Sequence, residues 1–149
     1  MTFDIQKAAE LISLSMTVPT VVLGIAVMHR WGPAALVALK ENTLDSHGWF
    51  ILGVVSSFLG SAFDNLYWSI AWTSSFYDGE HTNTLVSKGV YFNIVFRQGT
   101  GIFSAYCHLK AADMALSGSN KVANKLLAYS NIAAVLVGIG LGVYFLCKT

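Results

Sequence analysis

Two charged residues lie inside long apolar stretches of this 149-residue chain: Asp64 inside residues 48–73 and Arg97 inside residues 85–107. A charge at the centre of a membrane-spanning helix costs at least about 2.5 kcal/mol, so such residues normally face a partner, the protein interior or water. If the two helices are antiparallel neighbours, Asp64 and Arg97 meet at the same depth. We therefore predict an intramembrane ion pair between them.

Three amides lie close to these charges in the sequence and are candidates to complete their hydrogen bonding: Asn65, Asn93 and Gln98. Two interpretations of the polar centre remain open. The pair can simply fix the register of two helices, which is a known use of buried polar groups. It can also form a proton relay, an ion relay or a counter-charge for a substrate, because intramembrane charges often mark such pathways.

Three histidines form a second candidate site. His29, His47 and His108 each fall at the end of a predicted span, and all three ends lie on the same side of the membrane. Neutral imidazoles bind transition metals and haem iron. The spacing matches no H-E-x-x-H or C-x-x-C signature, and a belt of polar residues at headgroup level is the simpler interpretation. The cofactor is therefore unknown, and the main expectation is that there is none.

Apolar windows of about 20 residues are needed to position these side chains across a bilayer. The chain is 54% hydrophobic and only 11% charged, and its mean hydropathy is +0.57. Four windows are long enough: residues 11–28, 48–73, 85–107 and 126–147. The predicted fold is all-α, a single domain over residues 1–149, forming an integral membrane bundle of four transmembrane helices.

The connection between the first two windows predicts a further short helix. Pro33 suits the first turn of a helix and Trp31 suits a membrane interface. We therefore expect a short interfacial helix between the first two spans. Lysine and arginine are more frequent in the first and third connections, so the positive-inside rule places both termini of this multi-pass protein on the non-cytoplasmic side.

Small and polar residues recur every three or four positions in the windows, which places them on one face of each helix. Such faces allow membrane helices to approach closely. The glycines predicted to pack helices together are Gly53 and Gly60 in the second window, Gly89 and Gly101 in the third, and Gly138 and Gly142 in the fourth.

These patterns indicate a class of function rather than a ligand. A net charge of +1 without a basic cluster excludes nucleic acid as a main partner. The sequence contains no recognisable nucleophile–base pair or phosphate loop, so we expect no enzymatic activity. The leading hypothesis is a structural or accessory subunit whose partners are the lipid bilayer and either further copies of itself or other membrane subunits.

Two alternatives remain open. The first is a channel, a proton-coupled transporter or a phage holin-like permeabilising protein that uses Asp64 and Arg97. The second is a membrane redox enzyme with haem or metal at His29, His47 and His108.

Overall fold

A computed structural model shows the fold, and it describes residues 5–78 and 89–147. Helices account for the secondary structure of this part, and it contains no strand, which confirms the predicted all-α class. The elements are α1 (Ile5–Lys40), α2 (Ser46–Asp78), the π-helix η1 (Asn93–Gln98), α4 (Gly99–Met114) and α5 (Gly118–Leu146). Residues 89–92 are also helical and lead directly into η1.

Three segments in the described part of the chain are long and apolar enough to cross a membrane, which indicates a membrane protein. They are Ser15–Lys40 in α1, Ser46–Trp68 in α2 and Gly118–Tyr144 in α5. The third predicted window, 85–107, is not among them. Residues 85–88 lie outside the described residues, and the remainder of that window contains η1 and the first half of α4.

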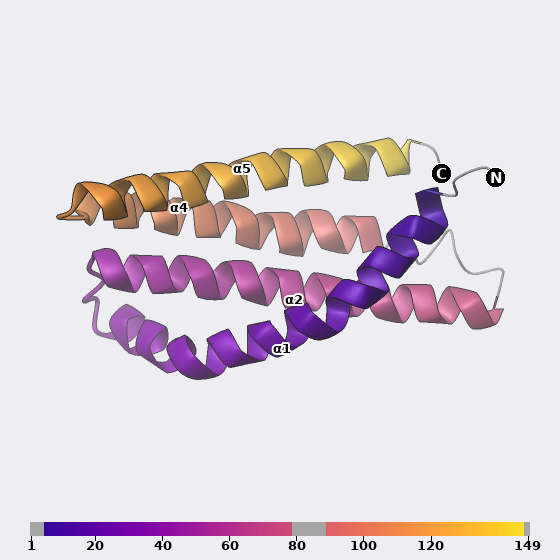
Figure 1. Cartoon of the computed structure of the whole chain (residues 1–149), viewed down its shortest axis with the longest axis horizontal. Coiled ribbons are helices and arrows are strands. Elements are labelled where there is room, and N and C mark those ends of the chain that lie inside the picture. The colour runs from indigo at the N-terminus through magenta and orange to yellow at the C-terminus, as the bar shows by residue number, and fades with distance from the viewer. Residues whose placement is uncertain (1–4, 79–88, 148–149) are drawn as a thin grey trace.

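The helices form an open row rather than a closed bundle (Figure 1). α1 packs on α2, α2 on α4 and α4 on α5, while η1 contacts α2, α4 and α5. Within residues 5–78 and 89–147, the outer helices α1 and α5 do not pack against each other. Each outer helix therefore buries one narrow face, whereas α2 and α4 each bury two.

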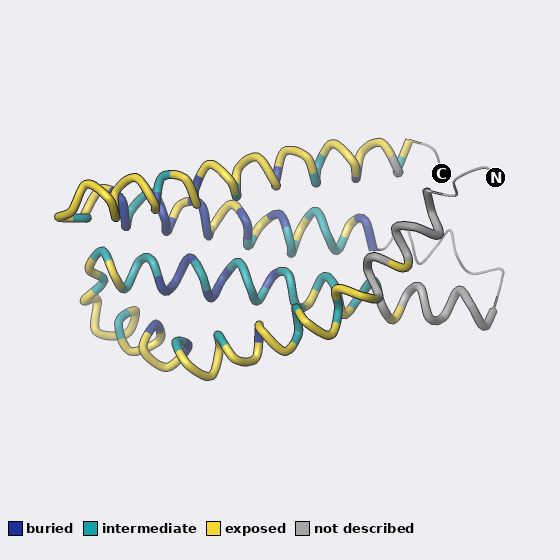
Figure 2. The backbone as a smooth tube through the Cα atoms, in the orientation of Figure 1, coloured by how far each residue is buried: buried dark blue, intermediate teal, exposed yellow. Residues whose placement is uncertain are grey.

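α5 shows this one-sided packing clearly (Figure 2). Its buried and half-buried seam is spaced alternately by four and three residues: Asn124, Ala128, Asn131, Val135, Gly138 and Gly142. Outside the seam, large apolar side chains such as Leu126 and Leu136 are about two-thirds exposed, at 64% and 66%. Apolar side chains pointing away from the row suit contact with lipid tails, which are as apolar as leucine.

The prediction of a separate interfacial helix between the first two spans is wrong, because α1 continues from Ile5 through Lys40. Pro19 and Pro33 both lie inside this helix. Proline in a helix interior removes one hydrogen bond and causes a bend rather than necessarily an end. Figure 1 shows α1 curving along α2, and Ala35, which is 3% exposed, keeps the segment after Pro33 packed in the core.

The turn between α1 and α2 explains why α2 begins at Ser46. Asn42 has a φ of 54°, a left-handed conformation that asparagine tolerates better than most residues. The Asp45 carboxylate then accepts a hydrogen bond of 2.7 Å from the Gly48 backbone N–H, as an N-cap residue does. On α2, the Ser46 hydroxyl donates to the Ala111 carbonyl at 2.7 Å and ties the start of α2 to the end of α4.

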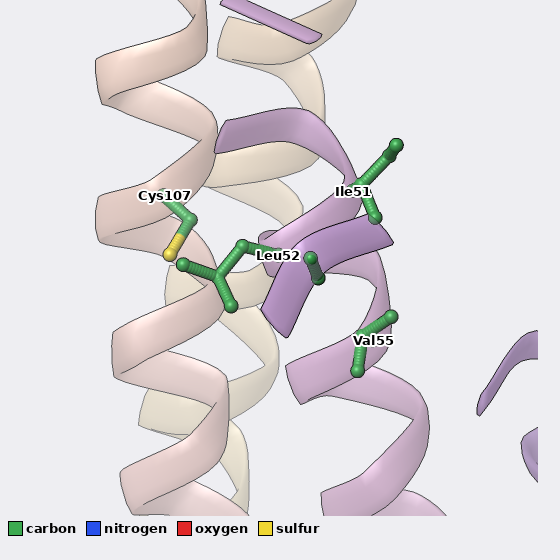
Figure 3. Packing of buried hydrophobic residues seen from close by; sticks show 5 residues of the cluster. Ile51, Leu52, Val55 and Cys107 are labelled. Carbon is green, nitrogen blue, oxygen red and sulfur yellow. The ribbon is translucent and has the colours of Figure 1, made fainter. Parts of the chain in front are cut away.

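The hydrophobic core lies where α1, α2 and α4 meet near this end of the row. Ile51, Leu52 and Val55 of α2 pack with Ala35 of α1 and Cys107 of α4. Figure 3 shows Leu52 pointing toward Cys107, whose side chain is fully buried. This cluster fixes the register in which the polar residues further along the helices meet.

Glycines make the close contacts between helices inside the row. A Cβ atom at Gly60 of α2 would collide with the Thr100 side chain of α4, and one at Gly138 of α5 would collide with the Gln98 amide. Gly140, two residues further along α5, has no atom within 4 Å of such a Cβ position. The two α5 glycines therefore provide a matched pair for a steric test.

We predict that Gly138→Leu destabilises the protein by about 1–3 kcal/mol or more, because overpacking a tight seam forces the helices apart. Gly140→Leu places the same side chain on the open face and leaves stability unchanged. Thermal unfolding in detergent micelles, followed by tryptophan fluorescence, measures both. Equal melting temperatures for the two variants would contradict the packing of α5 on η1.

Candidate functional site

Asp64 is the centre of a polar cluster between α2 and η1. The Asn93 side-chain amide donates a 2.8 Å hydrogen bond to Asp64 Oδ1. The Trp68 side chain, one turn further along α2, also hydrogen-bonds the Asp64 carboxylate. The carboxylate thus receives two donors from within the chain although it lies in a helix that is otherwise apolar, and both Asp64 and Asn93 remain half-buried.

The hydrogen bonding extends from Asn93 to Gln98. The Gln98 amide N–H donates to Asn93 Oδ1 at 2.8 Å, so Gln98 holds Asn93 while Asn93 donates to Asp64. Gln98 is only 6% exposed. Its amide fits against α5 because Gly138 has no side chain there.

The π-helix makes this contact geometrically possible. In an α-helix, residues five apart point in different directions, whereas residues three and four apart are neighbours. A π-helix bonds residue i to i+5 and is wider, so it brings positions five apart to the same side. Asn93 and Gln98 are the first and last residues of η1. Such π-segments are frequent at functional sites.

The predicted direct ion pair between Asp64 and Arg97 is not formed. Both residues are described, and no guanidinium nitrogen lies within 4.0 Å of a carboxylate oxygen. The extra residue in the π-turn explains the difference, because it turns Gln98 inward at the place where α-helical spacing from Asn93 predicted Arg97. Arg97 is half-buried beside the cluster, close enough for its charge to act on the Asp64 carboxylate.

Asn65 lies outside this network. Its backbone carbonyl accepts a 3.3 Å hydrogen bond from the Thr17 hydroxyl of α1, and its side chain is half-buried. The structure therefore brings Asp64, Asn93 and Gln98 into one hydrogen-bonded chain, with Arg97 nearby and Asn65 beside it.

A second polar layer joins α2, α4 and α5 nearer the turn end of the row. The Ser104 hydroxyl donates to the Gly53 carbonyl at 2.7 Å and accepts from the Asn131 amide at 3.2 Å. One fully buried serine thereby connects three helices.

His108 lies in the same layer, 2% exposed. Its Nδ1 is 3.2 Å from Asn124 Oδ1, and the Asn124 amide N–H donates to the Asn120 carbonyl at 3.0 Å. Because Asn124 Oδ1 can only accept, the hydrogen-bond network assigns the proton to Nδ1. Nε2 then faces Gly53, where a Cβ would lie 2.9 Å away.

Asn124 is a site residue that the sequence interpretation missed. It lies seven residues before Asn131, on the same seam of α5. Seven-residue spacing of asparagines in an apolar helix was the signal that identifies both as inward-facing.

Within the described residues, the three histidines do not lie together as one group of possible metal ligands. No group of three potential metal ligands occurs within the described part of the chain. His47 is exposed and stacks on Phe50 with ring centroids 6.4 Å apart. His29 is exposed partway along α1, because α1 does not end at Met28 as expected.

His29 instead lies at the edge of a groove of about 460 Å³ between α1 and α2. Apart from His29 the lining is apolar and includes Val21, Met28, Leu59 and Phe63. This groove places no second polar side chain opposite the imidazole, so it offers no evident chemistry.

Comparisons of the chain with protein-family models, with curated proteins and with solved structures found no match.

Asn93 holds the polar cluster together, and its loss removes one hydrogen bond from Asp64 and one from Gln98. We expect Asn93→Leu to lower the free energy of unfolding by about 1–3 kcal/mol, the cost of leaving buried polar groups unsatisfied. Asn65→Leu is the matched control, because it removes an adjacent amide outside the network. Chemical unfolding in micelles compares them, and a control as damaging as Asn93→Leu would contradict the assignment.

The separation of the histidines predicts no shared response to metal. We expect EDTA or added Zn²⁺ to leave the melting temperature unchanged. His108→Ala should destabilise by about 3 kcal/mol or more, since it opens a buried cavity and removes the donor from Asn124 Oδ1. His29→Ala and His47→Ala should change the stability by no more than about 0.5 kcal/mol. A metal-induced shift that all three variants abolish would restore the metal site.

Proposed function

We propose that this protein is a non-enzymatic integral membrane protein that acts as a structural or accessory subunit of a homo-oligomer or a larger membrane complex. The observation that carries the proposal is the open row of helices, which leaves charged residues only partly covered. Arg30 is exposed within the apolar segment of α1, and Asp64 and Arg97 are half-buried in α2 and η1.

Lipid tails are a poor cover for these residues. They supply no hydrogen-bond acceptor or donor, and unsatisfied polar groups inside the hydrocarbon region cost several kcal/mol each. Charged residues in membrane helices therefore usually face other helices or a polar cavity. A second protein surface against the open row supplies the missing cover.

The surface for association differs from the one that the sequence suggested. The packing glycines were expected to join subunits, but they contact helices of the same chain. Gly53 faces His108, Gly89 faces Tyr67 and Trp68, and Gly142 faces Ile94. In our proposal the glycines assemble the protomer, and the charged residues left at its surface assemble protomers with one another or with partners.

Our proposal keeps the membrane topology that the sequence predicts. The start of α1 and the end of α5 lie at the same end of the row (Figure 1), which agrees with an even number of crossings. We propose a multi-pass protein with both termini on the non-cytoplasmic side, because the opposite connections contain Lys40, Lys110, Lys121 and Lys125.

Transport is the second candidate, in the form of a channel, a proton-coupled transporter or a holin-like permeabilising protein. Asp64 favours it, because an ionisable residue inside a membrane helix often marks an ion or proton pathway, and the amides of Asn93 and Gln98 extend its hydrogen bonding. If this function is correct, Asp64→Asn should abolish proton or ion flux in liposomes without loss of assembly.

The subunit proposal predicts that the protein is not found alone in its own membrane. Native mass spectrometry after gentle extraction should show a closed homo-oligomer or a defined complex, and chemical crosslinking in the membrane should trap the same species. A monomer in both measurements, across a range of detergents, would exclude the subunit function.

A further inference from the structure

Arg97 has no acidic partner within the described residues, although it lies in an apolar run. Its guanidinium carries five N–H donors and stays charged under all physiological conditions. A Cβ at Gly101 would lie 3.7 Å from Arg97 Nη1, so the side chain extends along α4 toward that glycine. Among the described residues no carboxylate lies within 4.0 Å of it, although the Asp64 carboxylate of the same chain is near enough for the charge of Arg97 to act on it.

Lipid phosphate is a poor partner for Arg97 because of its depth. Arg97 lies about 12 Å along the helix from Gly89 and about 15 Å from Cys107, at 1.5 Å per residue. Both ends of the apolar run are therefore further away than an arginine side chain extends. The partner that fits is a carboxylate at the same depth in a neighbouring protein.

Asp64 is such a carboxylate. Its two oxygens offer about four acceptor positions, of which the amide of Asn93 and the side chain of Trp68 occupy two. Asp64 is half-buried, so part of it is open to a neighbour. It lies opposite η1, one turn from the level of Arg97, because Asn93 of η1 bonds it directly.

We propose that the face formed by α2 and η1 binds a second copy of this chain, with Arg97 of each copy pairing with Asp64 of the other. This inference rests on the proposed function as a subunit. A two-fold axis along the membrane normal keeps every residue at its own depth. It therefore brings the Arg97 of one copy to within one helical turn of the level of the Asp64 of its partner. Such an interface is self-complementary in charge, as two-fold dimers require.

Charge reversal distinguishes pairing between copies from pairing within one copy. Two differently tagged copies are coexpressed in membranes, and the amount of one that co-purifies with the other is measured. Asp64→Arg and Arg97→Asp should each weaken association with its own kind by about tenfold or more, since like charges then face each other. Coexpression of Asp64→Arg with Arg97→Asp should restore association to within about twofold of wild type, because both pairs between copies are then rebuilt.

The double variant Asp64→Arg/Arg97→Asp is the control for pairing within a copy, which it restores without any partner. If it self-associates but the mixed single variants do not, the pairing is within one chain and our inference is wrong. If wild-type copies do not co-purify with each other but do co-purify with another membrane protein, the inference is wrong while the subunit function stands. Wild-type protein that purifies alone overturns both.

Neutral variants provide a second measurement in case the reversed charges prevent insertion. Asp64→Asn and Arg97→Gln add no repulsion and keep the size of the side chains. Each should self-associate less than wild type, and Asn65→Ala beside them should not. Self-association of both neutral variants at the wild-type level would overturn the proposed pairing.

Discussion

The Asn93 side chain is the interaction on which the polar interior depends. It is the only group among the described residues that joins Asp64 of α2 to Gln98 of η1, by two hydrogen bonds of 2.8 Å. Low-polarity surroundings strengthen such bonds and raise the cost of losing either partner. The π-turn brings Asn93 and Gln98 to the same side of one helix, so that Gln98 can bond Asn93 while Asn93 bonds Asp64. It also places Arg97 beside the cluster instead of in it.

Close packing at small residues determines how the other helices of the row fit together. Lipid gives helices no hydrophobic reason to associate, so close van der Waals packing and hydrogen bonds between them must suffice. Gly60 against Thr100 and Gly138 against Gln98 supply the close approach. Ser104, which bonds Gly53 and Asn131, supplies the hydrogen bonds across the seam. Because α1 and α5 each have one such seam, nothing closes the row into a bundle.

Apolar windows and small-residue spacing predicted the helices well, since both depend on local sequence. The all-α class and the helices over residues 11–28, 48–73 and 126–147 follow directly from them. The bend at Pro33 was mistaken for a break, because only the packing of Ala35 on α2 decides between the two. The π-turn could not be predicted either, because one extra residue in a turn leaves no mark on the amino-acid composition. As a result, Asp64 bonds Asn93 and not Arg97 as predicted. The three histidines were expected at three helix ends, but His29 lies partway along α1, because α1 is longer than predicted.

The polar layer around Asn93 and the polar layer around Ser104 are separate from each other. The first layer ends at Gln98, which is packed against Gly138, and the second begins at Asn131 and Ser104. Between them on α5 lies Val135, which is buried against Gly101. The Thr100 hydroxyl, at the same level, donates to the Arg97 carbonyl of its own helix. A relay needs a continuous series of groups that exchange protons, and no hydrogen bond among the described residues joins these layers. Two separate layers, each linking neighbouring helices, are the arrangement expected when polar groups fix helix register.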